Sequence, residues 1–253
     1  IDNASPTIKN CTFSQNKALK GGAIYLKQSS SLLDNLILNS NFASQGHAIY
    51  IDHLSNVKLI NSNINTHFSL EGPYGSTIII SNESNAIFSR NIISNNQGSS
   101  GSAVKVASSS LIADNCLFAE NGYNTQSNSI DCNYSTCEFY HCTIVNSFDH
   151  DNNDEDLKIQ FSNLEISNSI IWNLNESTNS SYLSLDLHEN ISENIVNSNI
   201  MGGYNNNGIQ SINPMFISAS DFHLTDSSEC ISRGIDTPYL IDLDGNSRAL
   251  PTG

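Results

Sequence analysis

Ile8-Lys9-Asn10-Cys11-Thr12-Phe13 is the first copy of a short pattern that recurs through most of the chain. Its first and last positions are apolar, and its third position is usually asparagine. A repeat with a fixed period of about 20–50 residues is typical of a stacked solenoid. Successive copies start 25 to 29 residues apart. The other seven copies are Leu33–Leu38, Leu59–Ile64, Phe88–Ile93, Ala113–Phe118, Phe139–Ile144, Ile166–Ile171 and Ile195–Ile200.

A second apolar block follows the repeated pattern in each of the first seven copies. These blocks alternate with a period of two residues, which predicts short, half-buried β-strands. One set of side chains should then point inward: Ile24 and Leu26, Ile49 and Ile51, Ile78 and Ile80, Val104 and Val106, and Ile130 and Cys132. The intervening residues should point outward: Tyr25, Tyr50, Lys105 and Asp131.

No segment shows a sustained 3.6-residue period with helix caps, so the chain is predicted to be all-β. Short strands can pair in parallel without helical crossovers if the chain coils and each turn stacks on the last. The prediction is therefore a single-stranded right-handed parallel β-helix of about eight rungs over residues 1–201. Residues 202–253, where the pattern changes, are expected to form an irregular cap of the same domain that covers the last rung.

The asparagine at the third position is expected to stack at a bend between strands. Asparagine tolerates left-handed backbone angles, and stacked amides can hydrogen-bond along the solenoid. Six of the eight copies have asparagine there. Arg90 and His141 replace it in the other two, and we expect them to mark local distortions.

Composition excludes several classes of partner. The chain has 25 acidic and 10 basic residues and a net charge of −15, with no basic stripe. Nucleic acid and anionic membrane surfaces are therefore poor partners. No apolar run is long enough for a membrane span in this fragment. The chain starts at Ile1, and its six cysteines and few lysines favour an extracellular or cell-surface location. We expect a trimmed piece of a larger surface protein.

Two sets of motifs resemble those of known surface proteins. Phe13-Ser14-Gln15-Asn16 and Gly21-Gly22-Ala23-Ile24 are similar to the repeats of polymorphic outer-membrane-protein autotransporters and related adhesins. The C-terminal run with Asn213–Phe216, Asp221–Leu224 and Asp242–Arg248 resembles the tail of secreted bacterial parallel β-helix proteins. The resemblance implies a pectate-lyase-like fold and a surface-exposed, adhesin-like role.

Polysaccharide lyases and glycosidases share the fold that the resemblance implies, so catalysis must be considered. A lyase needs a Lys or Arg base beside a metal that neutralises the substrate's carboxylate, and a glycosidase needs paired carboxylates. Lys105 and Asp131, on neighbouring rungs, are the best candidates for catalytic residues. The alternative interpretation, which we favour, is an ion pair between stacked strands.

Tyr25 and Tyr50 are the best candidates for ligand binding. Two stacked, exposed rings would offer an apolar face to the C–H surface of a sugar. The same residues would also fit a purely structural aromatic pair between rungs. A glycan or another cell-surface ligand is the expected partner if the rings are open.

No cofactor is required by any motif, although Ca²⁺ has two candidate sites. The acidic run 149–156 contains Asp151 and Asp154, and a second, shorter motif contains Asp242 and Asp244. Carboxylate oxygens suit this cation. However, the first run lacks a fixed ligand spacing and is interpreted as a solvated loop, and the second fits a capping turn.

The cysteines offer two disulfide pairings. Cys116 and Cys142 occupy the same pattern position on adjacent rungs, and Cys132 and Cys137 close a short loop. Burial as free thiols is the alternative for all six. Taken together, the sequence predicts a non-catalytic adhesin or stalk module that could bind glycans. The alternative is a polysaccharide lyase or glycoside hydrolase acting in a groove along the solenoid.

Overall fold

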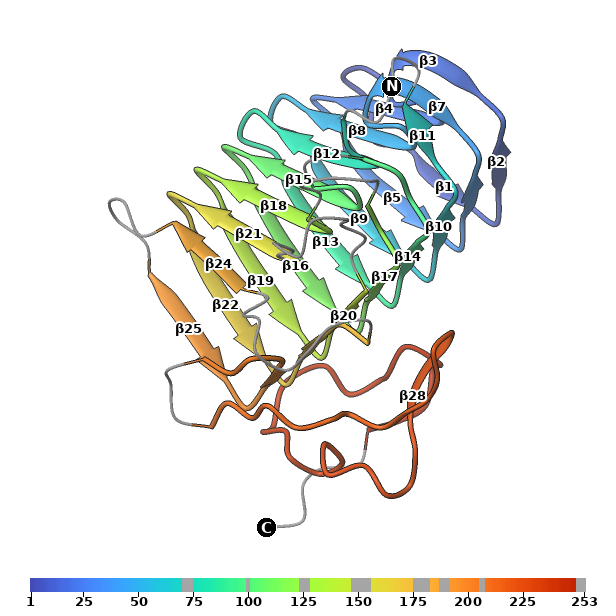
Figure 1. Cartoon of the computed structure of the whole chain (residues 1–253). Coiled ribbons are helices and arrows are strands. Elements are labelled where there is room, and N and C mark those ends of the chain that lie inside the picture. Colours follow the sequence, from blue (N-terminus) through green and yellow to red (C-terminus); the bar gives the residue numbers. More distant parts are fainter. Residues whose placement is uncertain are drawn as a thin grey trace.

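The computed structural model is a parallel β-helix in which the chain coils repeatedly and each turn stacks on the one before (Figure 1). It describes residues 1–69, 75–98, 101–122, 128–146, 156–174, 183–186, 192–204 and 208–248. These residues form 28 strands and no helix, so the predicted fold class is confirmed. No helix in the described part of the chain is long and apolar enough to cross a lipid bilayer.

Two sheets run the length of the solenoid with eight strands each, in agreement with the predicted number of rungs. The first, the B sheet, contains β1 (Thr7–Lys9), β5 (Ser30–Asp34), β9 (Asn56–Ile60), β13 (Asn85–Ser89), β16 (Ser110–Asp114), β19 (Thr136–Tyr140), β22 (Asn163–Ser167) and β25 (Glu193–Val196). The second, the C sheet, contains β2 (Thr12–Ser14), β6 (Ile37–Asn39), β10 (Asn63–Asn65), β14 (Ile92–Ser94), β17 (Leu117–Ala119), β20 (Thr143–Val145), β23 (Ile170–Trp172) and β26 (Asn199–Ile200).

Two further sheets complete the coil. The A sheet contains β4 (Ile24–Lys27), β8 (Ile49–Asp52), β12 (Ile78–Ser81), β15 (Val104–Ala107), β18 (Ile130–Asn133), β21 (Leu157–Gln160) and β24 (Leu183–Asp186). A short D sheet pairs β3 (Lys17–Lys20), β7 (Phe42–Gln45) and β11 (Phe68–Ser69). Outside the coil, β27 (Phe216–Ser218) and β28 (Asp221–Leu224) form an antiparallel hairpin.

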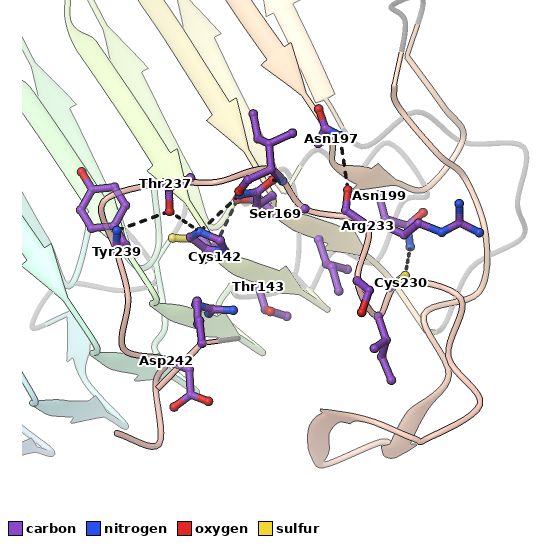
Figure 2. A pocket seen from close by; sticks show the side chains of 18 of the residues that line it. Cys142, Thr143, Ser169, Asn197, Asn199, Cys230, Arg233, Thr237, Tyr239 and Asp242 are labelled. Carbon is purple, nitrogen blue, oxygen red and sulfur yellow. Dashed lines mark hydrogen bonds between the residues drawn. The ribbon is translucent and has the colours of Figure 1, made fainter. Parts of the chain in front are cut away.

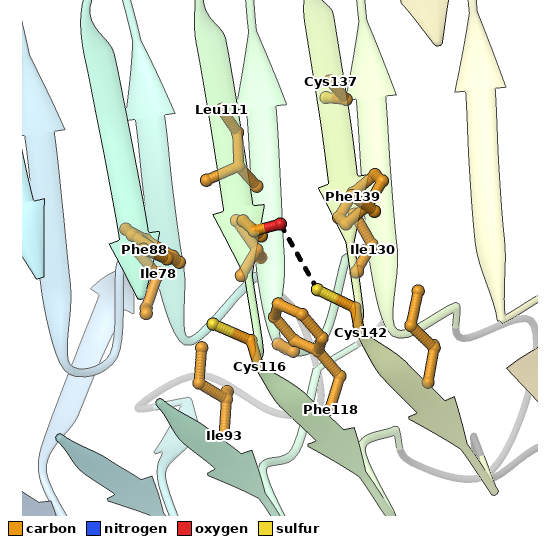
Figure 3. Close-up of a cluster of buried hydrophobic side chains, with 14 of the residues drawn as sticks. Ile78, Phe88, Ile93, Leu111, Cys116, Phe118, Ile130, Cys137, Phe139 and Cys142 are labelled. Atoms are coloured by element: carbon orange, nitrogen blue, oxygen red, sulfur yellow. Dashed lines mark hydrogen bonds between the residues drawn. The ribbon is translucent and has the colours of Figure 1, made fainter. Parts of the chain in front are cut away.

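The core lies inside the coil, between the sheets (Figure 3). All ten side chains predicted to point inward from the A sheet are less than 5% exposed. In the middle coils the core is filled by Phe88, Phe118 and Phe139, each with no exposed surface. Parallel strands keep like residues in register, as in the pairing of Phe88 with Ala113 and then Phe139. Alternating large and small side chains therefore fill the interior without altering the stacking.

The bend between the B and C sheets holds the third residue of the repeated pattern in every coil. We call these eight residues the bend ladder: Asn10, Asn35, Asn61, Arg90, Asn115, His141, Asn168 and Asn197. All have φ between 46° and 54°, so the predicted left-handed bend is confirmed. Along the ladder, Asn35 donates to Asn10 at 2.8 Å, and Arg90 Nε donates to Asn61 Oδ1 at 3.0 Å.

The expectation that Arg90 and His141 distort the coil was wrong. Their φ angles are 54° and 53°, equal to those of the asparagines. Their backbone N–H groups donate to Asp114 and Ser167 of the next coil at 3.0 Å. The stacked main-chain hydrogen bonds fix this conformation, so a residue that adopts it less readily is still held in place.

A second ladder lies inside the coil where the C sheet ends. This inner amide ladder consists of Asn16, Asn41, His67, Asn96 and Asn121, and its last four members have no exposed surface. The backbone N–H of each of the first four donates to the side chain of the next member, for example Asn41 N–H to His67 Nδ1 at 3.1 Å and His67 N–H to Asn96 Oδ1 at 3.1 Å. These polar groups can be buried because each is hydrogen-bonded.

His67 fits this ladder only as a neutral imidazole. Its Nδ1 accepts the Asn41 N–H, which leaves Nε2 to donate to the Leu38 carbonyl at 3.1 Å. Burial lowers the pKa of His67 to about 4, because it outweighs the hydrogen bonds to the Asn41 and Leu38 backbone, which raise the pKa. Protonation would place a second N–H against that of Asn41 and would break the ladder.

A serine ladder closes the turn between the A and B sheets. Ser29, Ser55, Ser84, Ser109 and Ser135 each donate a backbone N–H to the hydroxyl of the next serine in the series, which ends at Ser162, at 2.9–3.3 Å. Several of these hydroxyls also donate to a carbonyl of their own turn, as Ser55 does to Asp52 at 2.6 Å. Each serine therefore stabilises two coils.

Candidate functional site

Tyr25 and Tyr50 lie in register on β4 and β8, with ring centroids 5.6 Å apart in an edge-to-face arrangement. Both tyrosine side chains point away from the coil interior, as the alternation predicts. However, Tyr50 is only 7% exposed, and Lys20 Nζ lies 4.6 Å from the centroid of its ring. The pair therefore differs from the open platform that we expected, because Tyr25 and Lys20 cover Tyr50.

The Tyr25 hydroxyl donates to Asp52, which is the centre of a small polar cluster. Asp52 is 4% exposed and also accepts hydrogen bonds from Asn82 and His53. Burial opposes ionisation of Asp52, but the hydrogen bonds from Asn82, His53 and Tyr25 outweigh it and lower its pKa to about 2. Burial and the Asp52 carboxylate raise the pKa of Tyr25 to about 12. This network holds an ionised carboxylate and a protonated phenol, which fits a structural role.

Lys105 and Asp131 face each other on β15 and β18, with Lys105 Nζ 3.5 Å from Asp131 Oδ2. The Asp131 side chain is 5% exposed, whereas that of Lys105 is 37% exposed. A Cβ on Gly101 would lie 3.1 Å from Cβ of Asp131, so the backbone passes close over the carboxylate. The geometry is that of an ion pair between stacked strands with little open space beside the acid.

Of the proposed calcium ligands, Asp151 and Asp154 lie outside the described residues. Asp242 Oδ1 accepts the backbone N–H groups of Asp244 and Asn246 at 3.1 and 2.8 Å, which closes a turn. Asp244 Oδ2 lies 3.0 Å from Nε2 of His223, whose Nδ1 contacts Asp221. Among the residues that the structure describes, no three His, Cys, Asp or Glu side chains are grouped closely enough to hold a metal ion.

One of the two disulfide pairings is present, between Cys132 and Cys137. Cys116 and Cys142 stack on adjacent coils but remain free thiols. Cys142 Sγ donates to the Ala113 carbonyl at 3.4 Å (Figure 3), and Cys116 Sγ donates to the Asp114 carbonyl at 3.3 Å. Serine hydroxyls occupy this position in other coils and donate in the same way, as Ser169 does to Ser167. Burial, together with Cys116, raises the pKa of Cys142 and keeps it protonated.

The C-terminal segment, which was expected to cover the last rung, also turns back along the solenoid. Gln210 pairs with Asn199 of β26, which extends the C sheet by one bridge. Residues 230–248, here called the strap, then run over the bend ladder of the last four coils. Asn197 donates to the Arg233 carbonyl, and Asn168 bonds both the N–H and the carbonyl of Ile235, at 2.9 and 2.8 Å.

The strap continues toward earlier coils. His141 Nε2 lies 2.7 Å from Thr237 Oγ1, and the Arg248 guanidinium donates to Asn115 Oδ1. Successive coils thus meet strap residues 233, 235 and 237, two residues apart. Burial and the charge of Arg248 lower the pKa of His141 to about 4, so its imidazole is neutral beneath the strap.

A cavity of about 1130 Å³ lies between the strap, the hairpin and the outer side of the last coils (Figure 2). The coils contribute Thr143 and Ile170, and the strap contributes Arg233 and Asp242. Its lining mixes apolar side chains with amides and charged groups. This composition is suited to binding a polar organic ligand rather than a purely apolar one.

Two outward-facing pairs were not recognised in the sequence. Tyr134 and Phe161 stack face to face at the turn between the A and B sheets, with centroids 4.8 Å apart and planes 7° apart. Glu138 and Glu165 lie in register on β19 and β22, and the Tyr140 hydroxyl donates to Glu138 at 3.0 Å. Each pair is separated by one repeat period, which is the signal that could have identified them.

Comparison with known proteins agrees with the architecture. A family model described as a right-handed β-helix region matches residues 1–150. Neither the curated proteins nor the solved structures that were compared gave a match.

Proposed function

The chain belongs to the right-handed β-helix family, and on that premise we propose that it is a non-catalytic module of a secreted or cell-surface protein. In this role it is a rigid stalk that carries a glycan-binding surface on its side. The continuous stacking of the A, B and C sheets supports the stalk. The observation that carries the binding role is the stack of the exposed Tyr134 ring on the half-buried Phe161 ring.

Tyr134 is 64% exposed, although it is a large aromatic residue. The same turn of the preceding coil carries Ser108, which is too short to cover the free face of the Tyr134 ring. Tyr134 and Phe161 have φ of 48°, a conformation that is unfavourable for bulky side chains. A conformationally costly aromatic pair with one exposed ring is more readily explained by binding than by packing.

Polar groups accompany the aromatic stack. Asn133 donates to Gln160 at 3.3 Å, and each of these amides directly precedes one of the two rings. A ring face that contacts sugar C–H groups, with amides beside it for the hydroxyls, is a combination suited to carbohydrate. The net charge of −15 favours neutral or cationic glycans over polyanionic ones.

A glycan array tests this proposal. The parent protein should bind at least one glycan, and Tyr134→Ala and Phe161→Ala should each weaken that binding about tenfold or more, since each removes one large contact. Leu54→Ala is the matched control, because Leu54 is 59% exposed at the same turn of an earlier coil. Absence of binding by the parent, or equal binding by all three variants, would remove the proposal.

A second candidate function rests on Glu138 and Glu165. Two carboxylates in register on neighbouring strands, with a tyrosine hydroxyl on one of them, are the groups that a glycoside hydrolase requires. Burial and the hydrogen bonds to Glu138 and Glu165 raise the pKa of Tyr140, so its phenol stays protonated. Hydrolysis of a polysaccharide panel that stops with Glu138→Gln and with Glu165→Gln would favour this function over the non-catalytic one. A lyase would require the Lys105–Asp131 pair instead and would release unsaturated products.

A further inference from the structure

The bend ladder presents the same backbone in all eight coils but is covered in only part of its length. The strap contacts Asn115, His141, Asn168 and Asn197. Asn115 is 1% exposed beneath it. Asn10, Asn35 and Asn61, in the first three coils, are exposed, and none of the described strap residues is hydrogen-bonded to them. We call these three residues, with Arg90, the open ladder.

The strap shows how an extended segment binds this ladder. The Asn168 side chain pairs with both backbone groups of Ile235, as a neighbouring strand would. Gly234 approaches so closely that a Cβ there would lie 3.1 Å from the Asn168 side chain. Asn35 and Asn61 have φ of 53°, the same as Asn168, so their Cα–Cβ bonds leave the bend in the same direction. An extended peptide can therefore be bound by the same main-chain pairing.

The surface beside the open ladder also continues that beneath the strap. Ile170, the first residue of β23, is half-buried in the cavity under the strap. Ile37, the first residue of β6, occupies the equivalent position beside Asn35 and is 48% exposed. The Asn35 and Asn61 amides bond exposed or half-buried side chains that a peptide main chain can replace, those of Asn10, Asp34 and Arg90. A large apolar side chain next to such amides is the pattern that strand-like peptide binding uses.

The charge of the two parts differs in sign. Residues 1–90 contain six of the ten basic residues and only five of the 25 acidic ones. Lys9 and Lys58 flank the open ladder, which itself contains Arg90. The neighbouring carboxylate of Asp34 is 3.1 Å from Lys9 and accepts a hydrogen bond from Asn61. The hydrogen bond from Asn61 lowers the pKa of Asp34. Burial of Asp34 opposes this shift and Lys9 adds to it, so the Asp34 carboxylate stays ionised. Under the strap, Arg248 lies against Asn115 beside Asp114, so at this contact the basic group is on the strap and the acidic group is on the coil.

We propose that the open ladder is a docking surface for an extended acidic segment of a partner polypeptide. The segment pairs its main chain with the Asn35 and Asn61 amides, places a side chain against Ile37 and carries carboxylates toward Lys58 and Arg90. This role is separate from glycan binding at Tyr134 and Phe161, which lie at a different bend of the coil. It rests on continuity with the strap interface and on charge complementarity.

Calorimetric titration with a decapeptide of alternating Asp and Thr tests the proposal, with a decapeptide of alternating Lys and Thr as the peptide control. The acidic peptide should bind at low salt and the basic peptide should not. The double variant Asn35→Gly/Asn61→Gly should abolish binding, because glycine keeps the left-handed backbone and removes only the amides. Lys58→Glu should weaken binding about fivefold or more, the upper range for a surface charge.

Two variants control for general effects of these substitutions. Asn82→Gly removes an exposed left-handed asparagine from another bend, and Lys158→Glu makes the same charge change on the A sheet. Both should bind the peptide as the parent does, and thermal melts should show that every variant is folded. Binding that the control variants weaken equally, or no binding by the parent, would overturn the proposal. Dimerisation of the protein that Asn35→Gly/Asn61→Gly abolishes would also overturn it, in favour of a second copy as the occupant.

Discussion

The first and last coils share one backbone but have different surroundings. In both, the bend ladder has the same left-handed geometry, and its members from Asn10 to Asn168 each donate a backbone N–H to the next coil. Beneath the strap, the ladder side chains bond a second segment of the chain, whereas in the first three coils they bond only one another and their flanking residues. The stacking of coils therefore sets the geometry, and what lies over the ladder decides its role.

Truncation of a core phenylalanine should give the largest difference in stability between the first coil and the later ones. Phe118 on β17 has no exposed surface, whereas Phe13 occupies the same position on β2 and is only partly buried. Phe118→Ala should lower the free energy of unfolding by about 3–5 kcal/mol, and Phe13→Ala by less than about half of that. Urea denaturation of both variants measures the difference. Equal losses would show that the first coil is as well packed as the middle ones.

Acid should affect the first coils through His67. Its folded pKa of about 4 lies below the ordinary value of 6.5, so the unfolded chain binds the proton first. The stabilising contribution of the neutral imidazole is complete above pH 6.5 and is lost as the pH falls toward 4, by on the order of 3 kcal/mol. Denaturation at pH 7 and pH 4.5 should show a much smaller difference for His67→Asn, because asparagine occupies this ladder in the neighbouring coils. A pH dependence unchanged in that variant would contradict the tautomer assignment.

Removal of a bend-ladder amide should lower the free energy of unfolding appreciably only beneath the strap. Asn168→Gly removes two hydrogen bonds to Ile235 and should cost about 1–3 kcal/mol, with faster proteolysis of the strap. Asn35→Gly removes one exposed hydrogen bond, to Asn10, and should cost no more than about 0.5 kcal/mol. Thermal melts and limited proteolysis of the two variants provide the measurement. A strap as resistant to protease in Asn168→Gly as in the parent would mean that other contacts hold it.

The smallest change in the free energy of unfolding should come from removing one of two like charges on the B sheet. Glu138 and Glu165 face each other in register, and like charges in this arrangement are destabilising. Glu138→Gln should raise the free energy of unfolding by about 0.5 kcal/mol while still accepting the Tyr140 hydrogen bond. Lys58→Gln, whose register partners are Leu32 and Ile87, should leave the stability nearly unchanged. A destabilised Glu138→Gln would indicate that the carboxylate has a favourable partner.

The repeat was sufficient to predict the fold, because period and alternation alone fix which side chains fill a coil. The ten inward residues of the A sheet and the left-handed bend followed from that pattern. The burial of Tyr50 did not, since it depends on Lys20, which belongs to another sheet. The return of the strap to Asn115 also could not be predicted, because no period relates Arg248 to that coil. Tyr134 and Phe161 were in phase and could have been found.

The serine ladder has a consequence for how such a molecule can change length. From Ser55 to Ser162, each ladder hydroxyl accepts an N–H from the coil before it. The hydroxyls of Ser55, Ser135 and Ser162 also donate to a carbonyl of their own turn, so neighbouring coils share one hydrogen-bonding unit. Gain or loss of one complete repeat leaves every donor matched to an acceptor. Gain or loss of a fraction would strand a buried N–H and cost about 1–3 kcal/mol at each mismatch. Whole-repeat duplication is therefore the step by which this architecture can grow without passing through an unstable intermediate.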